Sequence, residues 1–198
     1  MFFDSRRSTA LAKHGMVATS QPLAAVAGLR VLMEGGNAVD AAVASAAVLN
    51  VVEPVSTGVG GDMFALVWNN KGKTVRAING SGRSPAAASL EALRSQGHEQ
   101  IPETGVHSIT VPGAVHGWET LLQGCGTMSL SELLKPAIRY AEEGFPVSDI
   151  ISFQWSRQLE KLARLPSGKE WLLDGRPPVH GEGMRAPTLA RTLRTIAE

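Results

Sequence analysis

The residues of this sequence best suited to binding a charged group lie in one short segment, Asn79-Gly80-Ser81-Gly82-Arg83-Ser84-Pro85. A guanidinium group among small residues can present two parallel N–H donors to a carboxylate. Arg83 is therefore a candidate carboxylate-binding residue. Two structural interpretations stay open beside it: an arginine exposed to solvent, or one paired with a local acid such as Asp62.

A second glycine-rich segment, Gly58-Val59-Gly60-Gly61-Asp62, could be compared with a phosphate-binding loop. Such a loop follows a strand and opens a helix. Here the sequence pattern predicts the opposite order, with a helix before the loop and a strand after it. We therefore expect a turn that lets the backbone pass close to another segment, or a pocket wall where a substrate approaches the backbone.

The other reactive side chains show no pattern typical of a metal site, a cofactor or a serine nucleophile. The five histidines have no metal-ligand spacing, and HxxH, HExxH, CxxC and GxSxG patterns are absent. The single cysteine, Cys125, cannot form an internal disulfide, and its flanking glycines predict a surface loop. The sequence thus predicts chemistry with no metal and no cofactor.

Composition limits the partners that the chain can bind. With 198 residues, 43% of them hydrophobic, the chain can bury a sizeable core. A net charge of +1 and an aromatic content of 5% argue against nucleic acid or a membrane surface as partner. The start, Met1–Arg7, lacks the apolar stretch of a secretory signal, and the apolar run 38–52 is too short for a membrane span. The predicted location is cytoplasmic.

Sequence patterns predict an alternation of helices and short strands after a flexible leader over residues 1–15. Helix signals include Pro22 at a first turn, Asn37 as N-cap with Asp40 three residues later, and a capping box at Ser129 and Glu132. Helices are expected at 22–33, from 38 to about 52, at 86–95, at 115–122, from 130 to 143, at 150–165 and from 187. Strands are expected at 16–19, 63–68, 74–79 and 107–111, with a turn at 69–72, and residues 166–186 are expected to be loop-rich.

Several of these segments, taken in order, resemble the N-terminal part of the γ-glutamyltransferase family, also called γ-glutamyltranspeptidases. The similar stretches are Gly35–Ala44, Val52-Glu53-Pro54, Gly58–Asp62, Val111–Trp118, Leu134–Ile138, Ala141–Val147 and Pro187–Leu193. The resemblance runs from about Met16 to Glu198. It implies an α+β fold of the N-terminal-nucleophile hydrolase type, an αββα sandwich, of which residues 16–198 would be an incomplete large-subunit portion.

The resemblance also implies a proenzyme that cleaves itself into a large and a small subunit. The new N-terminal threonine then attacks an amide carbonyl, with its own α-amino group as base. That threonine is expected beyond residue 198, so no catalytic residue is assigned within this chain, and the chain alone is expected to be inactive. The implied partners are a small-molecule amide substrate, with γ-glutamyl compounds of the glutathione type as the leading class, and the chain's own small subunit.

One departure from the family pattern concerns substrate selection. Glutathione-processing members hold the substrate α-carboxylate with the arginine of an R-E-x-A-P loop. Aligned on Pro85 without a gap, Ser81 takes that position, and Arg83 takes it only after a two-residue deletion. Ser81 and Arg83 are therefore both candidate substrate-binding residues. Two alternatives stay open: a related amidohydrolase or acylase acting on oxamate or cephalosporin side chains, and a non-catalytic binding protein that keeps the fold.

Overall fold

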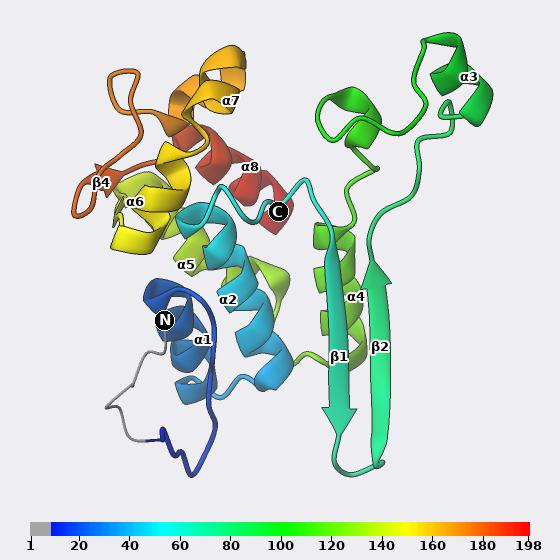
Figure 1. Ribbon diagram of the computed structural model, residues 1–198. Helices are drawn as coiled ribbons and strands as arrows, with labels where there is room; N and C mark the ends of the chain where they lie inside the picture. Colours follow the sequence, from blue (N-terminus) through cyan, green and yellow to red (C-terminus); the bar gives the residue numbers. More distant parts are fainter. Residues whose placement is uncertain (1–8) are drawn as a thin grey trace.

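The computed structural model describes residues 9–198, which form a layer of helices beside a β-hairpin that is backed by one helix (Figure 1). The helical layer consists of α1 (Pro22–Met33), α2 (Ala38–Val52), α5 (Leu130–Glu143) and α8 (Pro187–Ala197). Strands β1 (Met63–Asn69) and β2 (Thr74–Gly80) pack against α4 (Ala114–Cys125). The smaller elements are α3 (Leu90–Ser95), η1 (Val106–Ser108), β3 (Phe145–Pro146), α6 (Asp149–Ser156), α7 (Leu159–Arg164), η2 (Pro166–Trp171) and β4 (Gly183–Met184).

The helices of the central layer begin where their capping residues predict. Asn37 caps α2, its side-chain oxygen accepting hydrogen bonds from the backbone N–H groups of Val39 and Asp40. Ser129 and Glu132 form the predicted capping box of α5. Alanines fill much of α2, so neighbouring helices approach closely. The buried core follows from this packing and includes Val43, Val48, Leu133, Leu134 and Leu193.

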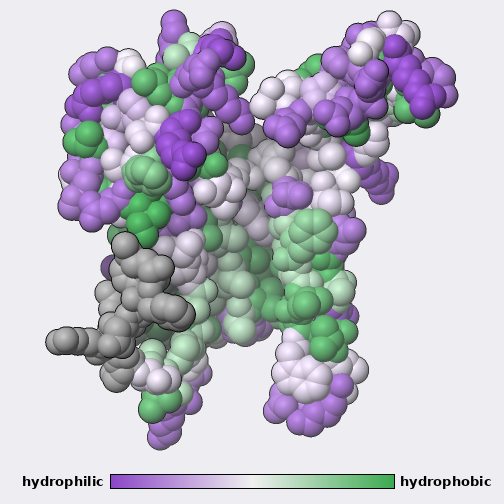
Figure 2. Space-filling model, viewed as in Figure 1, coloured by the Kyte–Doolittle hydropathy of each residue, from purple (hydrophilic) through white to green (hydrophobic). Residues whose placement is uncertain are grey.

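The predicted hairpin is confirmed, and its two faces differ. β1 and β2 are antiparallel, with Met63 opposite Gly80 and Trp68 opposite Val75. Met63 lies on the face that packs against α4. The opposite face exposes Phe64, Leu66 and Trp68 by 66%, 79% and 56%. Figure 2 shows hydrophobic colouring along this hairpin, so within residues 9–198 one apolar sheet face has no covering layer.

Two predicted strands are wrong. Residues 16–19 are not in a strand, because they lie beside helices α1 and α2 and form no backbone hydrogen bonds with another extended segment. The stretch 107–111 begins inside the 3₁₀ turn η1 and then runs past residues 81–83 with too few backbone bonds to form a strand. In both cases the β-branched residues suited a strand, but neither stretch forms a continuous ladder of backbone hydrogen bonds with a neighbour.

Two predicted helices are shorter than expected. The helix predicted at 86–95 begins only at Leu90, because Ser89 is its N-cap: the Ser89 hydroxyl accepts a hydrogen bond from the backbone N–H of Ala92. The helix predicted at 150–165 is broken into α6 and α7. At the end of α6 the indole Nε1 of Trp155 donates a hydrogen bond to the carbonyl of Trp171, 2.8 Å away. This bond fixes the end of α6 against η2, and α7 does not continue the axis of α6.

The loop-rich prediction for 166–186 omits the short turn η2 and strand β4, which pairs antiparallel with β3. Residues 9–15 of the predicted leader contain no helix or strand. Residues 1–8 lie outside the described residues, and with them the prediction made for Met1–Arg7. Within the described part of the chain, no helix is both long and apolar enough to cross a membrane.

Candidate functional site

Three glycine-containing segments that are far apart in the sequence meet at one end of the hairpin. The carbonyl of Gly61 accepts hydrogen bonds from the backbone N–H groups of Gly113 and Ala114, at 3.0 and 3.1 Å. The loop 58–61 closes on itself through the N–H of Gly61 and the carbonyl of Gly58. This loop is thus a turn in close contact with another segment, which is one of the two roles expected for it from the sequence. Its hydrogen bonds hold the start of α4 in place.

The close approach at this junction explains its glycines. Gly82 has φ of +81°, and a Cβ there would lie 2.0 Å from the carbonyl oxygen of Val111. A Cβ on Gly113 would lie 2.3 Å from the carbonyl oxygen of Gly80. Real Cβ atoms do not come this close to backbone, so no other residue fits either position without moving the chain.

Ser81 and Arg83 lie on this junction. The carbonyl of Ser81 accepts a hydrogen bond from the Thr110 hydroxyl at 3.1 Å. The carbonyl of Arg83 accepts one from the backbone N–H of Val111 at 2.9 Å. Ser81 is half-buried and Arg83 is exposed. The backbone of both residues is therefore fixed, while the guanidinium group of Arg83 is accessible. Among the described residues it forms no ion pair, so the interpretation that pairs it with Asp62 is wrong.

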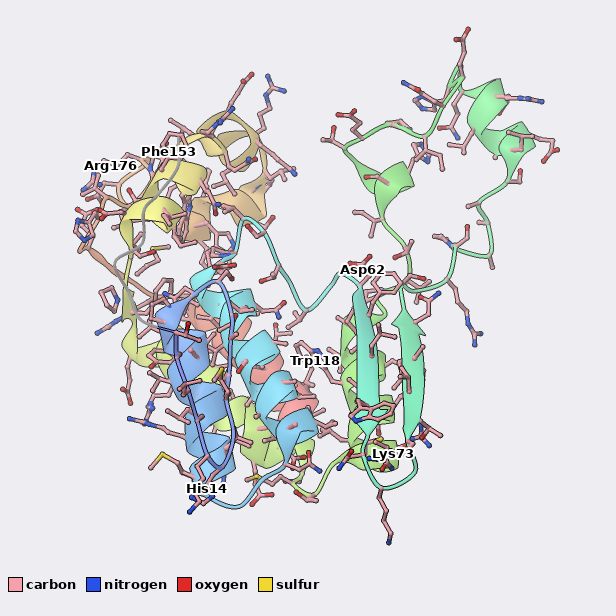
Figure 3. The ribbon with its side chains drawn as sticks, turned by 60° about the horizontal axis from the view of Figure 1, so that its bottom comes forward. His14, Asp62, Lys73, Trp118, Phe153 and Arg176 are labelled. Carbon is pink, nitrogen blue, oxygen red and sulfur yellow. The ribbon has the colours of Figure 1, made fainter. Side chains whose placement is uncertain are left out.

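A cleft of about 630 Å³ lies beside the junction, between α2, α4 and the start of β1. Figure 3 shows Asp62 at the start of β1 and Trp118 on α4, two of the residues that line it. Ala46, Leu49 and Asn50 contribute the α2 wall. Asp62 is the one charged residue among those that line the cleft. The cleft is thus largely apolar, with one acidic group at its rim.

Asn50 is a buried polar residue of this cleft that sequence reasoning missed as a functional candidate. It is 6% exposed, and its Nδ2 group donates to the Ala46 carbonyl at 2.6 Å. Its Oδ1 atom is buried and accepts no hydrogen bond from the described residues. Leaving a buried acceptor unpaired costs about 1–3 kcal/mol. The signal in the sequence was an asparagine interrupting an otherwise apolar helix.

The opposite end of α2 is fixed to the chain after α4 by Asp40, which is fully buried. Its carboxylate accepts hydrogen bonds from the backbone N–H groups of Asn37, Thr127 and Met128 and from the Thr127 hydroxyl. Burial raises the pKa of Asp40, but these hydrogen bonds outweigh it and the pKa lies below its usual value. Asn37 adds a bond from Nδ2 to the Cys125 carbonyl at 2.7 Å. These contacts hold α2 and α4, the two helical walls of the cleft.

Metal-capable side chains are not gathered at this junction. Across residues 9–198, no three His, Cys, Asp or Glu side chains lie close enough together to hold a metal ion. The surface loop predicted around Cys125 is wrong: Cys125 is the last residue of α4 and is half-buried. Its Sγ lies 3.4 Å from Nη1 of Arg76.

Comparison with known proteins identifies the family. The model of the gamma-glutamyltranspeptidase family matches residues 24–198, which include the junction, the cleft and Asp40. The chain belongs to the γ-glutamyltranspeptidase family. This confirms the resemblance drawn from the sequence motifs.

Three family relatives illustrate the range of named activities. The chain is 36% identical over 198 residues to a glutathione hydrolase proenzyme of Bacillus subtilis, covering 98% of this chain and 34% of the relative. It is 38% identical over 197 residues to an oxamate amidohydrolase proenzyme of Klebsiella pneumoniae, covering 96% and 37%. The crystal structure of cephalosporin acylase from Bacillus halodurans superposes with a TM-score of 0.84 at 40% identity, covering 100% of this chain and 39% of that one.

These comparisons also confirm the fold class. This chain of the γ-glutamyltranspeptidase family is a mixed α and β portion of an N-terminal-nucleophile hydrolase fold. It spans about a third of the length of the curated relatives it matches, 34% of the glutathione hydrolase proenzyme. That Ser81 and Arg83 bind substrate remains a prediction.

Proposed function

We propose that this chain is part of a self-processing enzyme that cleaves or transfers amide-linked acyl groups. The nucleophile in this proposal is a threonine from sequence beyond residue 198, freed by self-cleavage and activated by its own α-amino group. The observation that carries the proposal is the family match over 24–198, together with relatives that are named as proenzymes of amide-cleaving enzymes.

γ-Glutamyl amides of the glutathione type are the leading substrate class. The relative in Bacillus subtilis named for glutathione hydrolysis supports this choice. So does Arg83, whose exposed guanidinium group sits on a fixed backbone and is free to form two parallel bonds to an α-carboxylate. Ser81, two residues earlier, could add a hydroxyl donor to the same carboxylate.

A second candidate is an acylase or amidohydrolase of the same family that takes a different acyl group. Relatives named for oxamate and for cephalosporin favour it. So does the loop 81–85, which lacks the arginine at the position that an ungapped alignment gives to glutathione-processing members. A neutral contact in place of an arginine–carboxylate pair weakens selection for the α-carboxylate.

The test uses the protein encoded by the longer reading frame. Its intact mass is measured before and after incubation, and hydrolysis is then compared between a γ-glutamyl anilide and the glutaryl and oxamyl analogues. Two fragments split at a threonine and faster cleavage of the γ-glutamyl anilide support the leading proposal. Two fragments with preference for an analogue favour the second candidate, and an uncut, inactive protein contradicts both.

The contribution of Arg83 is tested in the same protein by Arg83→Ala, with Arg94→Ala on α3 as the matched control. Loss of one bidentate ion pair predicts a rise in KM for the γ-glutamyl anilide of about ten- to a hundredfold. The control is expected to leave KM unchanged. Equal KM values for both variants would remove Arg83 from the binding site.

A further inference from the structure

The segment between β2 and α4 brings two histidines into contact. Residues 84–110 of this segment, which we call the excursion, carry α3 and η1 and extend away from the helical layer (Figure 1). The ring centres of His98 and His107 lie 5.2 Å apart, with the ring planes at 63°. Eight residues separate the two histidines in the sequence, which is not the spacing of a common metal-binding motif. The pair is therefore created by the fold of the excursion.

Short-range hydrogen bonds order the backbone at both histidines. The backbone N–H of His98 donates to the Leu93 carbonyl at 3.1 Å, just after the end of α3. His107 lies within η1, where the N–H of Ser108 donates to the Gly105 carbonyl at 3.2 Å. Each imidazole group thus projects from a turn of defined shape.

The ring nitrogens of the pair are available to a ligand. Among residues 9–198, neither of these two rings takes part in a hydrogen bond or an ion pair, whereas His180 pairs with Asp149. His98 is half-buried and His107 is exposed. Rotation about the bond from Cβ to the ring turns the nitrogens and leaves the ring centre almost in place, and this torsion is broad in histidine. The two rings can therefore turn a nitrogen toward a common point without movement of the backbone.

The separation of the ring centres matches two imidazoles that share one metal ion. A ligating nitrogen lies about 2 Å from Zn²⁺, so the ring centres of two ligands at a tetrahedral angle lie about 5 Å apart. Imidazole is a preferred ligand of Zn²⁺, Cu²⁺ and Ni²⁺, whereas Mg²⁺ and Ca²⁺ prefer oxygen. Within the described part of the chain, no third His, Cys, Asp or Glu joins the pair. The pair therefore offers two nitrogen ligands, and water completes the coordination.

The charge of the excursion also favours a cation. Its acidic residues are Glu91, Glu99 and Glu103, and its one basic residue is Arg94. An excess of negative charge raises the local concentration of cations around a segment. The excursion thus attracts a divalent ion to the neighbourhood of the two imidazoles.

We propose that His98 and His107 together bind one divalent late transition-metal ion of the class Cu²⁺, Ni²⁺ and Zn²⁺. Two metal–nitrogen bonds replace two bonds from the ion to water, and the oxidation state of the ion does not change. The hydrogen bond from the N–H of Val111 to the Arg83 carbonyl already closes the inner end of the excursion. The ion closes the outer end, because it links the turn after α3 to η1. The proposal rests on the excursion alone and does not depend on the reaction proposed above.

The experiment is isothermal titration calorimetry of the untagged, metal-free 198-residue chain with NiCl₂ at pH 7. The same titration with MnCl₂, CuCl₂ and MgCl₂ supplies the matched ions. We expect saturable binding whose affinity rises in the order Mn²⁺, Ni²⁺, Cu²⁺, and no binding of Mg²⁺. Ni²⁺ is paramagnetic, so the backbone amide signals of residues 97–99 and 106–108 should broaden first in ¹⁵N NMR spectra.

Variants assign the binding to the two imidazoles. His98→Gln and His107→Gln should each weaken Ni²⁺ binding at least about tenfold, since changing a group that only orients a metal ligand already costs about that much. The matched control is His14→Gln, an exposed histidine that Figure 3 shows far from the excursion, and it should leave the affinity unchanged. His107 is exposed, so its variant keeps the test decisive if the His98 variant does not fold.

Four results would overturn the proposal. They are the absence of saturable Ni²⁺ binding, broadening centred outside the excursion, unchanged affinity in His107→Gln, and a loss in His14→Gln as large as in His107→Gln. Binding of Mn²⁺ as tight as that of Ni²⁺ would also contradict it, because that order is typical of carboxylate ligands rather than imidazoles.

Discussion

Replacing Asp40 by asparagine is expected to destabilise the chain strongly although the two side chains have nearly the same shape. One carboxylate oxygen, Oδ1, accepts the N–H groups of Thr127 and Met128 at 2.9 and 3.2 Å. The other, Oδ2, accepts the N–H of Asn37 at 2.8 Å and the Thr127 hydroxyl. An amide keeps one oxygen and turns an NH₂ group toward the remaining donors.

The magnitude follows from the bonds that change. The Thr127 hydroxyl can rotate to accept from the new NH₂ group, but the N–H of Asn37 cannot, and it becomes a buried donor facing a donor. That loss costs about 1–3 kcal/mol, and the neutral acceptor weakens the two bonds that survive. We expect Asp40→Asn to lower the free energy of unfolding by about 3 kcal/mol at pH 7.

The pH dependence gives a sharper test. Hydrogen bonds from Thr127, Asn37 and Met128 hold the pKa of Asp40 below its usual value in the folded chain. The unfolded state therefore binds its proton first as pH falls, and the stabilisation is complete above the unfolded pKa and lost as pH falls through the folded pKa. The difference between wild type and variant should be constant from pH 7 to about pH 5 and should shrink below about pH 4.

The assay is urea unfolding followed by tryptophan fluorescence from pH 7 to pH 3. The matched control is Asp174→Asn, an exposed aspartate with φ of +50°, a conformation that asparagine tolerates. It should change stability by less than about 0.5 kcal/mol. A loss below about 1 kcal/mol for Asp40→Asn, or a loss that stays the same at pH 3, would refute the reasoning.

Three further predictions address other parts of the chain. Gly82→Ala should lower the free energy of unfolding by more than about 2 kcal/mol in the same urea assay, because its Cβ would meet the Val111 carbonyl at positive φ; unchanged stability would contradict the close approach. Hydrogen bonds from Arg176 and from the backbone N–H of Val179, with the charge of Arg176, lower the pKa of Glu182 to about 2. NMR titration of the Glu182 side-chain carbon should show this pKa rising toward 4.5 in Arg176→Met, which keeps only the Val179 bond; the part of the stability that depends on the ion pair is present above about pH 4.5 and lost as pH falls toward 2. Asn50→Leu should leave stability equal or raise it by about 1 kcal/mol, because it removes an unpaired buried oxygen; a loss above 2 kcal/mol in urea unfolding would show that the oxygen is paired.

Local chemistry made much of this fold predictable. The capping groups Asn37 and Ser129 act through their own neighbours in sequence, so the start of α2 and of α5 could be placed from residue types alone. The hairpin was predictable for the same reason, since the Asn69 side chain accepts the N–H groups of Lys71 and Gly72 within the turn. In these cases the partner groups lie within a few residues.

The features that sequence reasoning missed depend on contacts between distant segments. The stretches 16–19 and 107–111 have strand-forming residues, but a strand also needs a neighbour, which no local pattern specifies. Asn50 was visible only as an interruption of an apolar helix, and its meaning depends on the cleft that α4 and β1 build around it. The position of Arg83 beside the junction likewise follows from hydrogen bonds to residues about thirty positions away.

The double hydrogen bond to the Gly61 carbonyl has a consequence for how the chain folds. Gly113 has no side chain to cap α4, so the first N–H groups of this helix are satisfied by a carbonyl from the loop before β1. The helix can therefore complete its first turn only after that loop has arrived, which requires closing a loop of about fifty residues. We expect the start of α4 to form late, together with the hairpin, so that mutations there change the unfolding rate more than the refolding rate.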